Sequence, residues 1–171
     1  MKRYKKLLFA VLGMVLCFFL FLLWYQYRYA MDVVEPYTVN SSSLEKKLLI
    51  ATQGSEFKNK VTQGIIQHFE TDSIFIKVID ITSLEKIEPD VFDAIVLLHT
   101  WENWKPPVEV KLFVERTKAS KDKIIVMTTS GEGSYKMEEV DAIVGESNLV
   151  EAVAVTDRII TGITLILKPH G

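Results

Sequence analysis

The sequence has almost no cysteine, because its single cysteine, Cys17, lies within a long apolar run near the N-terminus. The remainder of the chain therefore has neither a disulfide framework nor a thiolate metal site. Several glycine motifs are missing as well. The sequence contains no Gly-x-Gly-x-x-Gly, no Gly-Lys-Ser/Thr and no Gly-x-Ser-x-Gly, which excludes the usual signatures of dinucleotide-binding folds, P-loop enzymes and serine hydrolases.

Positive charge and histidine are also scarce in the polar part of the chain. Residues 46–171 contain 15 Lys and Arg against 19 Asp and Glu, which gives a formal net charge of −4. A nucleic-acid surface needs clustered positive charge, so we expect no nucleic-acid partner. The three histidines have no serine or cysteine nucleophile paired with them in sequence, and no cluster has metal-ligand spacing. We therefore assign no catalytic and no metal-binding residue.

The N-terminal apolar run predicts a membrane span. Residues 7–24 are eighteen residues without a charge. At a 1.5 Å rise per residue they form about 27 Å of helix, close to the ~30 Å hydrocarbon core. With Tyr25 added, residues 7–25 are predicted to be a signal anchor rather than a removed signal peptide, because the run is long and no small-x-small cleavage site follows it.

The charges around the span predict its orientation. A basic tip, residues 1–6, carries Lys2, Arg3, Lys5 and Lys6, whereas only Arg28 follows the span closely. The positive-inside rule then places the N-terminus in the cytoplasm and the globular part outside. We expect a single-pass protein of the cytoplasmic membrane whose residues 26–44, with Pro36 and a run of serines, form a juxtamembrane linker. Residues 45–171 are predicted to be one domain.

Apolar runs in residues 45–171 alternate with helical patterns. Five runs predict strands near residues 46–51, 74–81, 92–98, 123–128 and 140–144, and the first has no polar alternation, as in a strand covered on both faces. Helical patterns cover residues 57–70, a stretch from Pro107 onward, and residues 149–167. About a dozen residues separate the last two strands, too few for a full helix. This order predicts an open, mostly parallel α/β sheet with helices on both faces.

Three loops follow predicted strands, at the edge where open α/β sheets bind ligands. The first is Thr52-Gln53-Gly54-Ser55, which is equally consistent with an ordinary turn capped by Ser55 or Thr52. The second, residues 99–107, carries Trp101 and Trp104 after Thr100. These tryptophans suit a ligand contact, or a lid packed on the domain, a partner or the membrane surface. The third loop contains the following residues: Ser130, Gly131, Gly133 and Tyr135.

Residues 46–167 resemble flavodoxin in the order of these strands and loops, in the third strand Phe92-Asp93-Ala94-Ile95-Val96-Leu97-Leu98, and in the Gly-x-Gly-Ser-Tyr loop. The resemblance implies a five-stranded flavodoxin-like sheet that binds FMN. It places the FMN phosphate on Thr52, Gln53, Gly54 and Ser55, with Lys58 near by. It also places the isoalloxazine between the loop of Thr100, Trp101 and Trp104 and the loop of Ser130, Gly131, Gly133 and Tyr135. The implied activity is electron transfer for a membrane redox partner.

The chain also departs from the flavodoxin pattern. Glu56 puts a negative charge beside the phosphate loop, Phe57 replaces a hydroxyl position, and the helix between the last two strands is missing. These departures favour an alternative function, a flavin-free interaction module whose loops contact another protein or a small ligand. If the protein is an enzyme at all, it is at most an FMN-dependent electron carrier.

Overall fold

A computed structural model describes the backbone of residues 2–29, 31–138 and 140–168, and the side chains of residues 3–25, 31–138 and 140–168. The side chains of Lys2 and Arg28, on which the predicted orientation partly rests, lie outside the described residues. So do residues 169–171, at the end of the predicted domain. The chain forms two units, Met1–Met31 and Asp32–Gly171, which are described separately.

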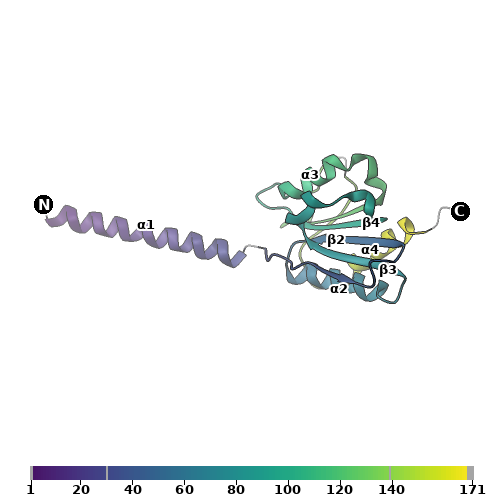
Figure 1. The fold of residues 1–171 in the computed structure, drawn as a ribbon. Coiled ribbons are helices and arrows are strands. Elements are labelled where there is room, and N and C mark those ends of the chain that lie inside the picture. Colours follow the sequence, from purple (N-terminus) through teal and green to yellow (C-terminus); the bar gives the residue numbers. More distant parts are fainter. Residues whose placement is uncertain (1, 30, 139, 169–171) are drawn as a thin grey trace. The chain divides into compact units, whose positions relative to one another are not determined.

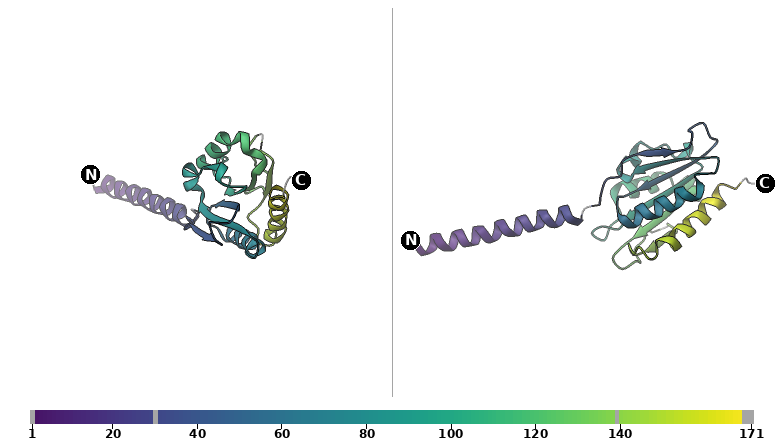
Figure 2. Two further views of the ribbon diagram at one scale, coloured as in Figure 1. Left: turned by 45° about the vertical axis from the view of Figure 1, so that its right-hand side comes forward. Right: turned by 90° about the horizontal axis from the view of Figure 1, so that it is seen from below.

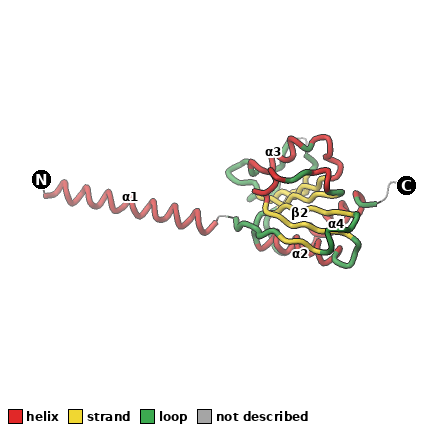
Figure 3. Tube along the Cα trace, in the orientation of Figure 1, coloured by secondary structure: helices red, strands yellow, loops and turns green. Residues whose placement is uncertain are grey.

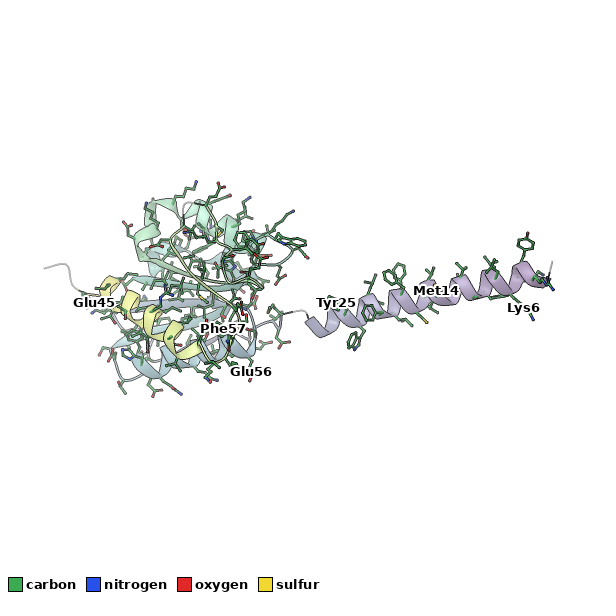
Figure 4. All side chains as sticks on the ribbon, turned by 180° about the vertical axis from the view of Figure 1, so that it is seen from behind. Lys6, Met14, Tyr25, Glu45, Glu56 and Phe57 are labelled. Atoms are coloured by element: carbon green, nitrogen blue, oxygen red, sulfur yellow. The ribbon has the colours of Figure 1, made fainter. Side chains whose placement is uncertain are left out.

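The first unit is the helix α1 (Lys2–Tyr29). Within it, Arg3–Tyr25 is a stretch of 23 residues that is long and apolar enough to cross a membrane. Figure 4 shows its side chains, Met14 and Tyr25 among them, standing out from the helix, and none of those described is buried. The predicted apolar N-terminal helix is therefore confirmed, whereas its orientation stays a prediction.

The second unit contains a mostly parallel sheet of six strands in the order β1-β3-β2-β4-β5-β6 (Figure 1). Every neighbouring pair among β2 to β6 is parallel, and only β1 runs antiparallel, on the outer edge of β3. The mostly parallel sheet is confirmed, but the predicted number of five strands is wrong. The strands are β1 (Tyr37–Val39), β2 (Lys46–Thr52), β3 (Ile74–Asp80), β4 (Ala94–Thr100), β5 (Ile124–Thr129) and β6 (Ala142–Gly145).

The additional strand comes from the segment that we predicted to be a linker. Tyr37 pairs with Val78 on β3, and the compact unit begins at Asp32 rather than near residue 45. Asn40 ends the strand in a left-handed conformation, with a φ of 67°, and its Nδ2 donates to the carbonyl of Ile74 at 2.9 Å. The edge of β3 needs a partner for its backbone groups, and a three-residue strand is too short to show a pattern in the sequence.

Helices cover both faces of the sheet, as predicted (Figure 3). On one face, α2 (Glu56–Phe69) packs beside α4 (Ala152–Ile166), and the two run side by side in Figure 2. On the other face, α3 (Val108–Arg116) lies beside two short 3-10 helices, η1 (Ile81–Lys86) and η3 (Lys118–Lys123). A third short 3-10 helix, η2 (Pro89–Val91), leads into β4.

The core explains why the first predicted strand shows no polar alternation. In β2, Leu48 and Ile50 face the core under α2 and α4, whereas Leu49 and Ala51 face the core under α3. Because both faces are dry, every position from Leu48 to Ala51 is apolar. Gly64 interrupts the apolar stripe of α2 for a packing reason, since a Cβ there would lie 2.8 Å from Cγ2 of Thr156 on α4.

The connection from β5 to β6 contains no helix among its described residues, 130–138, 140 and 141. The short spacing between these strands predicted this shortened connection. Its consequence is that the described residues place no covering helix on the sheet face beyond α3, where parallel crossovers usually supply one.

Candidate functional site

The predicted loops meet at the carboxyl edge of the parallel sheet. Thr52 ends β2, Thr100 ends β4 and Thr129 ends β5, and the register pairs Thr100 directly with Thr129. His99 and Thr100 belong to β4 and not to the loop after it, so the predicted start of the second loop is two residues too early. Within this edge, β2 and β4 are neighbours whose following connections run to opposite sides of the sheet, β2 to β3 and β4 to β5. Open α/β sheets usually bind ligands at such a point.

Gln53 joins the first two loops. Its Oε1 accepts a hydrogen bond from the backbone N–H of Thr100 at 2.6 Å, and its Nε2 donates to Oε1 of Glu102 at 2.9 Å. Its own backbone N–H donates to the carbonyl of Leu98 at 3.2 Å. Gln53 is buried, so these bonds form in a partly dry environment where they hold the loops firmly.

Lys58 lies inside this edge although it carries an ionisable amine. Its Nζ donates to Oγ1 of Thr100 at 2.6 Å and to Oγ of Ser55 at 3.3 Å, and Thr100 Oγ1 lies 2.9 Å from Oγ1 of Thr129. Burial lowers the pKa of Lys58 to about 8, and the charge of Glu102 partly opposes that shift. The amine of Lys58 therefore fills the space between the first two loops.

The segment before β1 covers the first loop. The backbone N–H of Gly54 donates to the carbonyl of Asp32 at 2.7 Å, and the N–H of Asp32 donates back to the carbonyl of Gly54 at 3.0 Å. The N–H of Val34 then donates to the carboxylate of Asp80, at the end of β3, at 2.9 Å. We call residues 32–36 the strap. No composition signal in the sequence identifies it, because its hydrogen bonds are donated and accepted mainly by its backbone groups, and only the Val34 side chain packs against the core.

The third loop is folded onto the second. The rings of Trp101 and Tyr135 are stacked, with centroids 5.9 Å apart and an interplanar angle of 18°. Gly133 adopts a φ of +64°, which glycine tolerates, and its N–H donates to the carbonyl of Ser130 at 3.1 Å. Gly131 is exposed, and a Cβ added there would meet no atom within 4 Å.

Trp104 lies apart from this network. It occupies the tight turn Glu102-Asn103-Trp104-Lys105, in which Glu102 and Lys105 exchange backbone hydrogen bonds of 2.8 and 2.9 Å. Asn103 and Trp104 have φ values of 48° and 59°, and the Trp104 side chain is 78% exposed. A bulky residue with positive φ costs about 1 kcal/mol relative to glycine. The sequence predicted a ligand contact for Trp104, but the structure does not bring it to the other predicted residues.

No family model matches this sequence, and no curated protein matches it significantly. Among the described residues, no three His, Cys, Asp or Glu side chains are grouped as a metal site would require.

The residues at the carboxyl edge do not fit FMN in this arrangement. Two rings that sandwich a flat cofactor stand about 7 Å apart, twice the carbon contact distance, whereas the centroids of Trp101 and Tyr135 are 5.9 Å apart. The N–H of Gly54 already bonds Asp32, and the N–H of Lys58 bonds the Ser55 hydroxyl at 3.3 Å. The phosphate cradle and the ring site are thus both closed by groups of the chain itself.

An open groove of about 1140 Å³ lies on the sheet face beyond α3. Its lining includes Ile124 and Val126 of β5, Val114 of α3, and Met137 and Val140 of the β5–β6 connection. Trp101 also lines it, which connects the groove to the carboxyl edge. We did not predict this groove from the sequence. The signal for it was the short β5–β6 connection, which is too short to contain a full helix that would cover this face. Asp32, Glu102 and Thr129 were also not predicted as members of the edge network.

Proposed function

We propose that this protein is a membrane-anchored interaction module that binds a helical segment of a partner protein in the groove beside α3. The observation that supports this most directly is the groove itself, which lies over β5 where the crossover to β6 has no described helix. Its volume of about 1140 Å³ exceeds the ~300–1,000 Å³ of most small-molecule pockets. An amphipathic helix is the element that ordinarily covers such a sheet face.

The lining of the groove is amphipathic in a way that suits a helix. Val126 is buried, but Val114 of α3, Ile124 of β5, and Met137 and Val140 of the β5–β6 connection are partly exposed and can contact a single apolar stripe. Among the described lining residues, the α3 and η3 wall carries three lysines against Glu115 and Asp122, a net charge of +1, whereas the opposite wall carries Lys136 against Glu138 and Asp141, a net charge of −1. The best complement is therefore a helix with acidic residues along one flank and basic residues along the other.

The proposal is tested with a synthetic amphipathic peptide of about four helical turns, with leucines at i, i+4 and i+7, glutamates on one flank and lysines on the other. We expect the labelled peptide to bind the full chain in phosphatidylcholine nanodiscs saturably, in fluorescence anisotropy. Val114→Asp should weaken binding at least tenfold, since it places a charge among the apolar residues of the groove.

Val150→Asp is the matched control, because Val150 is 86% exposed and does not line the groove. It should leave the affinity unchanged, and empty nanodiscs should bind no peptide. A peptide of the same composition with its leucines dispersed around the helix should bind at least tenfold more weakly. Equal binding by both peptides, or equal affinity of the two Asp variants, would contradict the proposal.

Electron transfer through FMN is the second candidate function. It is supported by the order of the five parallel strands, β3-β2-β4-β5-β6, which is the arrangement that flavodoxin-like sheets use. It is also supported by the position of Thr52, Gly54, Trp101 and Tyr135 at one edge of the sheet. The closed contacts within that edge favour the flavin-free module over this candidate.

A flavin titration separates the two candidates. We expect the purified full chain to be colourless and added FMN to keep its fluorescence, because Trp101 rests on Tyr135 and the N–H of Gly54 is already bonded. The measurement is FMN fluorescence against protein concentration in nanodiscs, with empty nanodiscs as the control. Saturable quenching that is lost on Tyr135→Ala would instead support the electron carrier.

A further inference from the structure

The turn that carries Trp104 is a rigid, exposed aromatic tip. Reciprocal backbone hydrogen bonds between Glu102 and Lys105 close it, and Gln53 bonds Glu102 at 2.9 Å from the neighbouring loop. Trp104 is nevertheless 78% exposed, and Val108 beyond the turn is 65% exposed. A large aromatic side chain held in this way contributes little to the core of the domain.

The backbone conformation of the turn makes tryptophan an unusual residue at position 104. Both central residues, Asn103 and Trp104, have positive φ, a conformation in which Asn and Gly are the common choices. Trp104 therefore occupies a position where glycine would be less strained. Local strain of this kind at an exposed side chain points to a contact outside the domain.

The strap ties Asp32, the first residue of the second unit, to the loops beside this tip. Asp32 pairs with Gly54, and the adjacent Gln53 bonds Glu102 of the tip. From Tyr25, where the candidate span ends, four helical steps and three further residue steps lead to Asp32. Fully extended, that connection spans at most about 17 Å, which limits the distance between Tyr25 and Asp32.

We infer that Trp104 inserts into the interfacial zone of the lipid bilayer in which α1 is anchored. Tryptophan is enriched at this depth because its ring is apolar while its N–H can still reach water or a headgroup. The charges of the turn, one on Glu102 and one on Lys105, cancel, so a zwitterionic headgroup suits it. The inference rests on the proposed membrane anchoring and adds a second, shallow contact of the domain with the same membrane.

The chain has three tryptophans, Trp24, Trp101 and Trp104, which allows a direct test. Three full-length variants each keep one tryptophan and replace the other two with phenylalanine. They are reconstituted in phosphatidylcholine vesicles, either plain or brominated on the acyl chains close to the headgroup, and tryptophan fluorescence is compared. Far-ultraviolet circular dichroism checks that each variant keeps the fold.

Bromination should quench the Trp24-only protein, because Trp24 lies in the span, and should lower the emission of the Trp104-only protein at least twofold. The Trp101-only protein should change much less, since Trp101 is stacked on Tyr135. Quenching of Trp24 without quenching of Trp104 would overturn the inference and leave the anchor intact, and the tip would then be free for a protein partner. An unquenched Trp24 would overturn the anchoring and the inference together.

Discussion

Acidification from about pH 7 to about pH 5 is expected to lower the free energy of unfolding of the domain by about 2 kcal/mol through one side chain, His99. His99 is fully buried at the end of β4, and its Nε2 lies 3.0 Å from Oγ1 of Thr128 on β5. Burial lowers the pKa of His99 to about 4, the charge of Lys58 adds to that shift, and the backbone of Thr100 partly opposes it.

Acidification lowers the free energy of unfolding because the unfolded state then binds more protons than the folded state. In the unfolded chain a histidine titrates near pH 6.5, so at about pH 5 the unfolded state binds a proton that folded His99 does not bind. Stability therefore falls as the pH decreases from the unfolded pKa toward the folded value of about 4. The effect exceeds that of most surface substitutions.

His99→Gln provides the comparison, because the variant keeps the other two histidines of the chain. Urea unfolding of both proteins, measured at several pH values between about 7 and 5, should show a steeper loss in the unmodified protein. The difference in slope is the readout, so the absolute stability of the variant does not matter. Equal slopes would show that His99 accepts a proton in the folded state.

Apolar patterning predicted the parallel strands of the sheet correctly because both faces of these strands are buried or partly buried. The run Leu48-Leu49-Ile50-Ala51 has no polar residue, since alternate side chains enter two different cores. The same reasoning located β3, β4 and β5 to within a few residues. It failed for β1, whose three residues are held by backbone pairing with β3 and are partly exposed.

Strand order predicts which residues share the carboxyl edge of the sheet, but it does not predict whether that edge is open or closed. Strand order places Thr52, Thr100 and Thr129 at one edge, and that follows from the parallel sheet. Lysine side chains are mostly exposed in proteins, and nothing in the sequence shows that Lys58 is only 1% exposed between the loops. Long-range backbone bonds such as those of Asp32 carry no residue signature either, and they decide whether the edge is open or closed.

Gly54→Ala should detach the strap and lower the free energy of unfolding by about 2 kcal/mol, roughly the sum of two backbone hydrogen bonds. A Cβ at residue 54 would overlap the carbonyl oxygen of Asp32 and lie 2.8 Å from its carbonyl carbon. Both atoms belong to the backbone, so the strap must move away rather than rearrange a side chain. The reciprocal bonds of 2.7 and 3.0 Å between Asp32 and Gly54 would then be lost.

Gly131→Ala is the matched control for this prediction, because a Cβ at Gly131 meets no atom within 4 Å. Hydrogen exchange followed by mass spectrometry should show faster exchange in the strap of Gly54→Ala and unchanged exchange in Gly131→Ala, while urea unfolding reports the stability of both.

The Gly54→Ala variant also tests which groups close the phosphate cradle. If Gly54→Ala, whose strap is released, still does not bind FMN, Lys58 and the stacked Trp101–Tyr135 pair are sufficient to exclude FMN, since neither depends on Asp32. Unchanged strap exchange in Gly54→Ala would show that the strap is held mainly by β1 and by the bond from Val34 to Asp80.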